Sequence, residues 1–499
     1  PIYPAQSSLK PRKKWVQVGG WILVVVLLLF GISTRSRNPL LAFVSLAFSV
    51  LYLLTLMTKK DAALTSRGLE IFYQMQITTQ YDFFPWEQIN SIVTEDRKHP
   101  DLIRLHIGYS SMEKALFFTR SDAEAIIKLA KEKNVDFVIV APDDPLCLGM
   151  VDALAEQGIP AFGPRKNAAI IEGSKVFSKN LMKKYGIPTA AYETFDDYDA
   201  AVKYLQTADM PIVVKADGLA LGKGVLICPD RENAVEAVAS MMKEAKFGAS
   251  GARVVIEEFL TGPEVSVLAF TDGKTVKPMV SSMDHKRALD HDEGLNTGGM
   301  GTIAPNPCYT PELAQRCMDE IFLPTIAAMN AEGRTFTGCL YFGLMMTPKG
   351  PKVIEYNCRF GDPETQVVLP LLKSDLLTIM RATVDGTLAD TPVEFASGAA
   401  CCVVLASGGY PVSYKSGYPI SGLDEANKTA TVFHAGTKLI DGQIVTAGGR
   451  VLGVTATADT LEAAIDKAYQ AADKITFTDM HMRRDIGQRA LASRKESHS

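Results

Sequence analysis

The chain lacks the features that mark several classes of protein. Its 499 residues carry 52 basic and 56 acidic side chains, a net charge of −4, so positive charge is not in excess. We therefore expect no nucleic-acid partner. The eight cysteines show no Cys-x-x-Cys spacing, and we expect reduced cytosolic thiols rather than a disulfide framework. No Ser/His/Asp or Cys/His nucleophile is apparent.

The most informative stretch is residues 351–364, which predict a metal-binding strand. Val353 and Ile354 indicate a buried strand, on which Glu355 and Asn357 lie two residues apart. Side chains at that spacing share one face of a strand. A carboxylate and an amide oxygen on one face suit Mg²⁺ (or Mn²⁺) that bridges phosphates and keeps several waters. The alternative is a hairpin end with two solvated polar side chains.

A second segment predicts a phosphate-binding flap. A strand that ends at Lys215 is followed by a glycine-rich loop and by another strand from Val225. In the loop, Gly222 and Gly224 let the backbone approach a phosphate, and Lys223 adds charge. The pattern differs from a P-loop, because Gly224 replaces the Ser or Thr that would hold the metal and a strand follows instead of a helix.

Charged residues around these segments are candidates for a nucleotide site. Glu257 and Glu258 end a predicted strand, Glu264 follows them, and Lys175 lies in an amphipathic helix predicted to open at residues 172–175. A strand backbone can pair with adenine, a carboxylate can accept from ribose hydroxyls, and a lysine can bind phosphate. Each would be an ordinary surface residue if found alone, but their order along the chain favours nucleotide binding.

These segments together resemble the ATP-grasp fold. Three further stretches narrow the resemblance to the phosphoribosylamine–glycine ligase (glycinamide ribonucleotide synthetase) family, and they lie at residues 284–301, 359–364 and 432–452. The resemblance runs from about residue 121 to about residue 490. It is specific, because several motifs occur in order with spacing similar to that of the family.

The resemblance implies an ATP-dependent ligase of purine synthesis. ATP would phosphorylate the glycine carboxylate, and the amine of 5-phosphoribosylamine would attack the acyl phosphate to give glycinamide ribonucleotide, ADP and phosphate. Lys175 and Lys215 would hold the α- and β-phosphates. The candidate catalytic residues are Lys215, Arg359 and Asp362. The candidate substrate-binding residues are Asp284, Lys286, Arg287, Asn296, Thr297 and Gly298, and which substrate group each one meets stays open.

The first 120 residues predict a membrane anchor. Residues 15–33 and 40–58 are apolar runs without a charge, each close to the length that spans a bilayer. Basic residues outside the two runs favour a hairpin with both ends in the cytoplasm, which leaves the ligase part there too. Membrane lipid would then be a partner of residues 15–58, if this segment is genuine. A cleaved signal peptide is the alternative for the first run.

We expect an α/β fold, of the α+β ATP-grasp type, in five parts. They are a transmembrane helical hairpin (1–60), a small β-rich module (61–118), a partial preATP-grasp domain (121–170), an ATP-grasp domain (171–390) and a β-rich C-terminal small domain (391–490). Within them we expect a loop at residues 142–145, a helix near 146–157, a hairpin turn at 348–350 and a mainly helical stretch at 366–384 that breaks at Pro370. In the C-terminal domain we expect strands at 401–406, 431–435 and 450–455 and a helix at 461–475. The hairpin and the module resemble bacterial two-span membrane proteins with a pleckstrin-homology-like domain.

The start of the ligase part departs from the family pattern. Family members open with a strand and a glycine-rich loop, and nothing similar precedes residue 121. A join near residues 117–123 indicates a gene fusion, a misassembled reading frame or a truncated sequence. Two alternative functions therefore stay open: an ATP-grasp ligase with other substrates, and a membrane-anchored, catalytically impaired ATP-binding protein.

Overall fold

The computed structural model describes residues 136–219, 224–244 and 248–496, and only the backbone of seven strands before them. The chain forms two units, Pro1–Val135 and Asp136–Ser499. The predicted transmembrane hairpin at residues 15–58 lies outside the described residues, as do Gly222 and Lys223 of the flap. In the part of the chain that is described, no helix combines the length and apolar character that a bilayer span needs.

The described part of the first unit consists of antiparallel strands. The β-rich character predicted for residues 61–118 is confirmed, although the strands Thr79–Pro85 and Met112–Thr119 were not predicted. One sheet contains β1 (Ile2–Ala5), β2 (Lys59–Thr65), β3 (Gly68–Gln74) and β4 (Thr79–Pro85). A second contains β5 (Ile89–Glu95), β6 (Leu102–Tyr109) and β7 (Met112–Thr119).

The second unit opens with a short parallel pair, β8 (Val138–Ile139) and β9 (Ala161–Phe162). Between them lie α4 (Asp143–Leu148) and α5 (Met150–Glu156). The prediction of a loop at residues 142–145 and one helix at 146–157 was wrong. The helix starts earlier because Asp143 and Asp144 stabilise its N-terminus. It is interrupted at Gly149, whose φ of +98° only glycine adopts easily.

The next pair of helices contains one that was predicted and one that was not. The helix expected to open at residues 172–175 is α7 (Lys175–Tyr185), whereas α6 (Lys166–Gly173), which ends just before it, was not predicted. Ser174 has an extended backbone, and its hydroxyl accepts from Phe177 N at 3.1 Å as the N-cap of α7. Glu172 and Lys175 therefore lie on either side of a sharp corner.

The flap belongs to the first of two four-stranded sheets. Its order is β10 (Tyr192–Phe195), β13 (Val254–Glu258), β11 (Ile212–Ala216) and β12 (Val225–Cys228). The predicted strand–loop–strand is confirmed, since β11 and β12 are antiparallel with Lys215 opposite Val225. The apolar faces of α8 (Tyr198–Leu205) and α9 (Arg231–Met242) complete its core.

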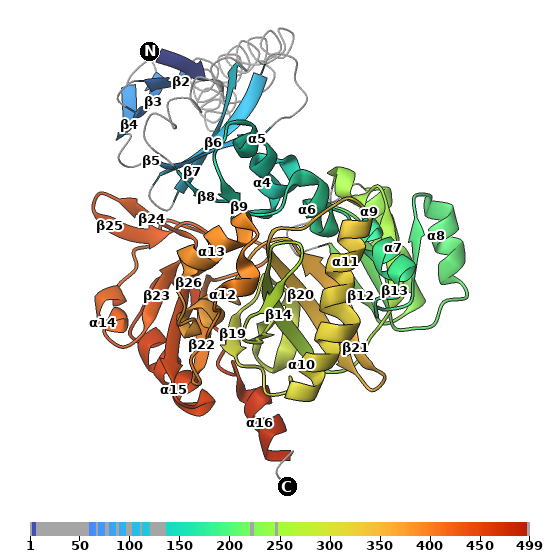
Figure 1. The fold of residues 1–499 in the computed structure, drawn as a ribbon. Coiled ribbons are helices and arrows are strands. Elements are labelled where there is room, and N and C mark those ends of the chain that lie inside the picture. The colour runs from blue at the N-terminus through green and yellow to red at the C-terminus, as the bar shows by residue number, and fades with distance from the viewer. Residues whose placement is uncertain are drawn as a thin grey trace, which may run out of the picture. The chain divides into compact units, whose positions relative to one another are not determined.

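The second sheet carries the predicted metal strand. Its order is β15 (Val276–Pro278), β14 (Glu264–Thr271), β20 (Gly338–Thr347) and β21 (Gly350–Asn357). β20 and β21 form the predicted hairpin, and nearly all of β20 is buried. In Figure 1, α10 (Pro311–Cys317) and α11 (Leu323–Ala331) run across this sheet.

A third, larger sheet joins the predicted ATP-grasp and C-terminal segments. Its order is β16 (Met283–Asp284), β19 (Gly301–Ala304), β22 (Ala399–Ser407), β26 (Arg450–Ala458) and β23 (Thr431–His434), and β27 (Met480–His481) also pairs with β22. The last three predicted strands and the helix α15 (Leu461–Ala472) are confirmed. Figure 1 shows this sheet on the side of the unit away from β12 and β13.

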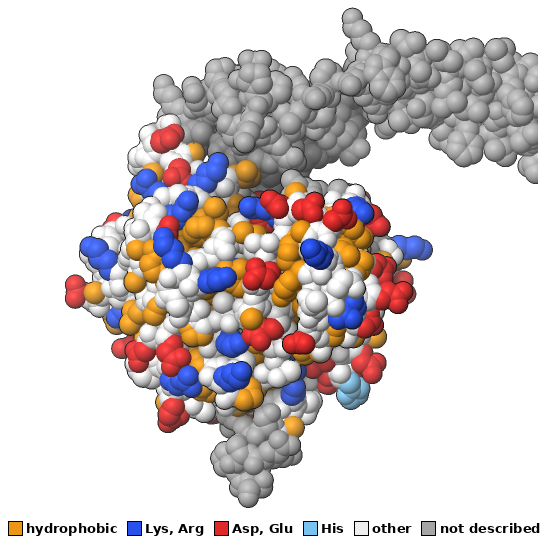
Figure 2. All heavy atoms as spheres, turned by 90° about the vertical axis from the view of Figure 1, so that its right-hand side faces the viewer, with side chains coloured by type: hydrophobic (Ala, Val, Ile, Leu, Met, Phe, Trp, Pro, Cys, Tyr) orange, Lys and Arg blue, Asp and Glu red, His pale blue; other side chains and the backbone are white. Residues whose placement is uncertain are grey.

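The remaining elements connect these layers. The helical stretch predicted after the metal strand, with a break at Pro370, is confirmed by α12 (Thr365–Val368), a 3₁₀ turn at Leu369–Leu371 and α13 (Leu376–Asp385). Smaller elements are β17 (Arg287–Leu289), β18 (Glu293–Asn296), α14 (Leu423–Asn427), β24 (Thr437–Ile440), β25 (Gln443–Thr446) and α16 (Gln488–Glu496). Figure 2 shows basic and acidic side chains interspersed over the face that carries α8.

Candidate functional site

The metal strand is shaped by a local irregularity in its pairing. Glu355 lies opposite Gly343, but Leu344 lies opposite Val353, so β21 carries one extra residue at Ile354. A Cβ on Gly343 would lie 3.1 Å from Cγ of Glu355. Glycine at this position therefore leaves room for the Glu355 side chain at the surface of the sheet.

Lys215 brings the flap strand into contact with the metal strand. Its Nζ donates to the carbonyl oxygen of Ile354 at 3.1 Å, and the residue is 2% exposed. Ile354 immediately precedes Glu355. The flap lysine and the proposed metal carboxylate, expected to share a triphosphate, thus lie side by side although 139 residues separate Lys215 from Ile354.

A buried carboxylate lies between two lysines behind this contact. Both Lys215 and Lys179 form ion pairs with Glu257, which is 4% exposed. Burial raises the pKa of Glu257, but the two ammonium groups outweigh burial and hold the pKa below its usual range. Burial also lowers the pKa of Lys179 to about 8. Glu257 was predicted to bind nucleotide, and the structure gives its carboxylate two lysine partners instead of leaving it open to ribose.

Lys179 was missed from the sequence, although a signal was present. It lies four residues after Lys175 on α7, so both lysines occur on the same face of one helix. The Nζ of Lys179 also donates to Thr189 Oγ1 at 2.8 Å, whereas the Nζ of Lys175 donates to Gly218 O at 3.1 Å. Lys175 therefore reaches the base of the flap.

The positive charges of three lysines act on the Glu355 carboxylate. Burial raises the pKa of Glu355, but the charges of Lys286, Lys215 and Lys175 outweigh it and hold the pKa below its ordinary value. For Lys175, burial lowers the pKa and the Glu355 charge opposes that shift. Glu355 is therefore ionised at neutral pH, inside a cluster of net positive charge that suits a polyphosphate.

Lys286, a predicted substrate residue, joins this cluster. It pairs with Glu264 at 3.0 Å. The Glu264 charge raises the pKa of Lys286 well above its usual value, and the Lys286 charge lowers the pKa of Glu264. Glu264 was predicted as a nucleotide residue; in the structure its partner is Lys286, which was predicted to bind substrate. Glu258, predicted with it, accepts from Lys352 Nζ at 2.6 Å and from Ala191 N at 3.0 Å.

Asp217 anchors the base of the flap to α7, and sequence reasoning missed it. Its Oδ1 accepts from Val176 N at 2.9 Å and from Ser174 Oγ at 2.8 Å, and Arg253 pairs with its Oδ2. At the other end of the loop, the carbonyl oxygen of Gly224 accepts from Ala216 N at 2.8 Å. The two ends of the flap are thus held where β11 and β12 begin to diverge.

The predicted substrate loop is bound to the C-terminal sheet through Arg450. Nη1 of Arg450 donates to the carbonyl oxygens of Gly298 and Asp362, at 2.7 and 2.8 Å, and Nη2 pairs with the Asp362 carboxylate at 3.0 Å. Thr297 donates from its N and Oγ1 to the carbonyl oxygen of Lys286 at 2.7 and 2.8 Å. Arg450 was missed as a site residue, although its Gly-Gly-Arg motif was recognised in the sequence.

Other predicted substrate residues have local roles in the structure. Arg287 donates to Gly294 O at 2.7 Å, across the hairpin of β17 and β18, and Asn296 is its strand partner. Asp284 accepts from His285 N at 2.8 Å. Burial, and then the charge of Glu364, raise the pKa of Asp284 well above its usual value. Asp284 thus lies close to the Lys286 cluster, whereas the Arg287 guanidinium is engaged within its own hairpin.

Arg359, predicted as catalytic, follows the metal strand directly. Its Nη2 lies 3.2 Å from Glu172 Oε1 and 3.8 Å from Asp143 Oδ2. Burial lowers the pKa of Arg359, but the charges of Glu172 and Asp143 outweigh that effect and raise it. Arg359 is therefore a fixed cation next to Asn357, within the same corner of the unit as Glu355.

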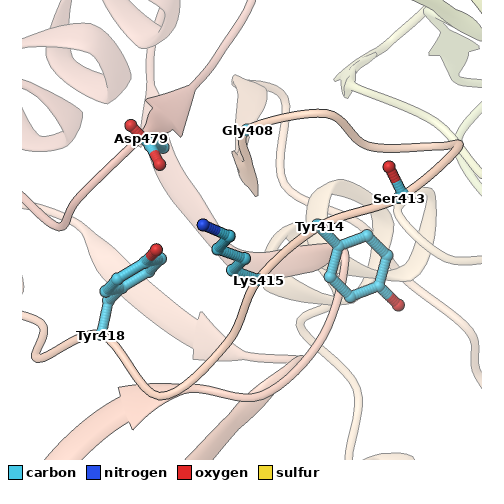
Figure 3. Close-up of a pocket in the computed structure, with 6 residues that line it drawn as sticks. All are labelled: Gly408, Ser413, Tyr414, Lys415, Tyr418 and Asp479. Carbon is cyan, nitrogen blue, oxygen red and sulfur yellow. The ribbon is translucent and has the colours of Figure 1, made fainter. Parts of the chain in front are cut away.

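A separate cavity of about 280 Å³ lies in the C-terminal part, away from these residues. In Figure 3, Lys415 extends into it with Asp479 and Tyr418 nearby, while the Tyr414 ring points to the other side of its loop. None of the predicted site residues lines this cavity.

Comparison with known families matches both parts of the second unit. Residues 173–365 match the family described as phosphoribosylglycinamide synthetase, ATP-grasp (A) domain, and residues 400–489 match the C domain of the same synthetase. Residues 3–143 match a bacterial PH domain.

Individual proteins give the same result. The phosphoribosylamine–glycine ligase of Halalkalibacterium halodurans is 47% identical over 390 residues, which are 78% of this chain and 91% of the relative. The crystal structure of phosphoribosylamine–glycine ligase from Thermotoga maritima has a TM-score of 0.65 and 36% identity, covering 72% of this chain and 88% of that one.

A more distant structure is similar in fold alone. It is the biotin carboxylase domain of the Hydrogenobacter thermophilus 2-oxoglutarate carboxylase, in complex with MgADP, ADP and bicarbonate. Its TM-score is 0.56 at 19% identity, with 72% of this chain and 78% of that chain covered.

Proposed function

This chain belongs to the phosphoribosylamine–glycine ligase family, and from that membership we propose how its own residues carry out the reaction. The chain is an ATP-dependent ligase that joins glycine to 5-phosphoribosylamine in purine biosynthesis. A glycyl phosphate forms first, and the amine of phosphoribosylamine then displaces phosphate to leave the amide of glycinamide ribonucleotide. In phosphoryl transfer the protein contributes mainly positioning and charge stabilisation.

One observation carries the proposal for the site. Lys215 of the flap strand donates to the carbonyl oxygen of Ile354, the residue before Glu355. A phosphate-binding lysine and a carboxylate kept ionised by three lysines thus occur at one place. Lys175 and Lys215 would bind the α- and β-phosphates, and the glycine-rich flap, including Gly222, Lys223 and Gly224, would close over them. Closure would exclude water from the acyl phosphate, which hydrolyses easily.

The residues present fit Mg²⁺ (or Mn²⁺) bound together with nucleotide. Glu355 supplies an ionised carboxylate and Asn357 an amide oxygen, which are the donors a hard cation prefers. The described residues contain no group of three or more His, Cys, Asp or Glu side chains that could hold a metal alone. Most ligands would therefore come from phosphate and water, as is usual for magnesium at nucleotide sites. When bound, the ion would neutralise charge on the phosphates.

Substrate binding is proposed for the residues that lie between the metal strand and Arg450 with its partners Gly298 and Asp362. Arg359, Lys286 and the backbone of residues 296–298 offer positive charge and N–H groups to the glycine carboxylate and the sugar phosphate. Asp362 is held by Arg450, whose charge also acts on Asp284. Fixed donors of this kind lower the cost of orienting two small substrates.

The test is glycine-dependent nucleotide turnover by the purified full chain. We expect steady ADP formation only when ATP, Mg²⁺, glycine and phosphoribosylamine are all present, and exchange of labelled ADP into ATP that requires glycine but not phosphoribosylamine. Glu355→Ala should abolish both. The matched control is Glu425→Gln, which alters an exposed carboxylate paired with Lys428 on α14. Turnover with another acid but not with glycine would replace this substrate assignment.

Growth of a purine auxotroph tests the same proposal in cells. The wild-type chain should restore growth, and the Glu355→Ala variant should not. Growth with neither chain would favour the impaired ATP-binding protein over an active ligase.

Membrane attachment is a separate proposal for the N-terminal segment. The two charge-free apolar runs at residues 15–33 and 40–58 support it. We expect the full chain to sediment with membranes and a chain lacking residues 15–58 to stay in the supernatant. The ligase part would lie in the cytoplasm. Equal partition of the two chains would contradict attachment.

A further inference from the structure

Glu172 is a buried carboxylate that the reaction scheme above does not use. It lies at the C-terminal end of α6, immediately before the corner at Ser174, and it is 7% exposed. Its Oε2 accepts from the backbone N of Cys358 at 2.6 Å, and its Oε1 lies 3.2 Å from Nη2 of Arg359. One side chain thus contacts two consecutive residues that directly follow the metal strand.

The same carboxylate also determines how Asn357 is oriented. The hydrogen-bonding pattern is satisfied when the Asn357 amide nitrogen donates to Glu172 Oε1 at 3.1 Å and to Tyr356 O at 3.2 Å. In the opposite orientation the amide oxygen would face only acceptors. Because the nitrogen faces Glu172, the amide oxygen points to the other side and is free to act as a ligand.

We propose that Glu172 is a positioning residue that orients the Asn357 amide oxygen toward the metal and fixes the Arg359 guanidinium for substrate. This inference deepens the proposed function and rests on it. Metal ligands are commonly oriented by hydrogen bonds that they donate to a neighbouring carboxylate. Here one carboxylate would orient both Asn357, the proposed metal ligand, and Arg359, the cation proposed to bind substrate.

A purely structural role accounts less well for these contacts. A buried carboxylate costs free energy unless its oxygens are paired, and an apolar side chain could fill the same volume without that cost. Burial raises the pKa of Glu172, and the Arg359 charge opposes the shift. All three partners, Asn357, Cys358 and Arg359, come from one short segment, so the carboxylate acts on the part of the chain that carries the proposed ligands.

Asp143 provides a matched control for this inference. It approaches the same Arg359 guanidinium at 3.8 Å, from the first turn of α4. Its Oδ1 accepts from Asp144 N, whereas the Asn357 amide donates to Glu172. Removing the Asp143 charge should therefore disturb Arg359 and leave the orientation of the Asn357 amide unchanged.

The experiment compares Glu172→Gln with Asp143→Asn by two readouts. Mn²⁺ bound to the enzyme–ADP complex is measured by electron paramagnetic resonance, and the KM for glycine is measured by ADP release. Glu172→Gln should weaken Mn²⁺ binding by about 10- to 100-fold, the usual effect of removing a partner of a metal ligand, and should raise the KM. Asp143→Asn should raise the KM but leave Mn²⁺ affinity within about twofold, since it does not touch the ligand.

The outcomes separate this inference from the function itself. Wild-type Mn²⁺ affinity in folded Glu172→Gln would overturn the positioning role, and so would equal loss of affinity in both variants. If Glu172→Gln does not fold, Glu172→Asp keeps the charge beside Arg359 but shortens the side chain, and it should still weaken Mn²⁺ binding. Absence of glycine-dependent turnover in the wild type would instead contradict the proposed function, while the Mn²⁺ comparison would still test the orientation of Asn357.

Discussion

Lys215 forms an ion pair with Glu257 in the interior of the second unit, where both side chains are almost inaccessible to solvent. Because Lys179 pairs with the other oxygen of the same carboxylate, the three groups together carry one net positive charge. That charge lies at the end of β11, next to the metal strand. We infer that Glu257 holds the flap lysine in place for a phosphate and does not itself bind the ribose.

Removing the central carboxylate should destabilise the fold. Glu257→Gln leaves two buried lysines without their anion, and breaking a buried ion pair in this way costs about 3 to 5 kcal/mol. Urea unfolding followed by circular dichroism measures this loss. The exposed control Glu425→Gln should change the free energy of unfolding by less than about 0.5 kcal/mol. Equal stability of the two variants would show that Glu257 is not needed to neutralise the lysines.

Nucleotide affinity should depend on Lys215. The Lys215→Met variant keeps a similar side-chain volume but removes the charge that is proposed to bind the phosphates. A hydrogen bond to a charged group contributes about 1.5 to 3 kcal/mol, so ADP should bind about 10- to 100-fold more weakly by calorimetry. Lys184→Met, which removes an exposed lysine paired with Glu332, is the control and should bind ADP normally. Unchanged affinity in Lys215→Met would contradict the flap assignment.

Stability should fall in acid because of His285. Its Nε2 accepts from Gly487 N and its Nδ1 contacts Gly301 O, both at 3.1 Å, so the buried ring is neutral with its proton on Nδ1. Burial, and then the charges of Arg483 and Arg489, lower its pKa from 6.5 to about 4. The unfolded chain therefore binds more protons than the folded chain between these two values, and stability decreases as the pH falls through this window.

The expected size of the His285 effect is about 3 kcal/mol, since one pKa unit corresponds to about 1.4 kcal/mol. Urea unfolding at a series of pH values between about 7 and 4 measures the slope. His285→Asn removes the titrating group, so its free energy of unfolding should depend less steeply on pH than that of the wild type. Identical slopes in the two proteins would assign the acid sensitivity to other groups.

Arg450 should affect substrate binding without affecting the nucleotide. Arg450→Lys cannot reproduce the three bonds that the guanidinium makes to Gly298 and Asp362. The KM for phosphoribosylamine should rise by about tenfold, a loss comparable to one charged hydrogen bond, while ADP affinity stays unchanged. Arg316→Lys, at an exposed pair with Glu320, is the control. An equal loss of ADP affinity in Arg450→Lys would indicate a general structural role.

Local sequence pattern predicted the elements that carry the site better than it predicted their ends. The β11–β12 pair and the β20–β21 hairpin follow from runs of β-branched and apolar residues separated by glycine and turn residues. The helix boundary near Gly149 was wrong, because a left-handed glycine interrupts a stretch that is otherwise suitable for helix. Propensity alone does not distinguish one long helix from two short ones.

The sequence by itself determined that Glu355 and Asn357 share a strand and that Lys215 lies near the end of another, because both facts depend on residues close together in the chain. Only the tertiary structure decided that Glu257 lies between two lysines, that Glu172 contacts Arg359, and that Arg450 reaches Gly298 across 152 positions. Such contacts arise where separate sheets and helices pack together. They depend on the arrangement of distant segments, which alternation, capping and turn patterns along one segment do not encode.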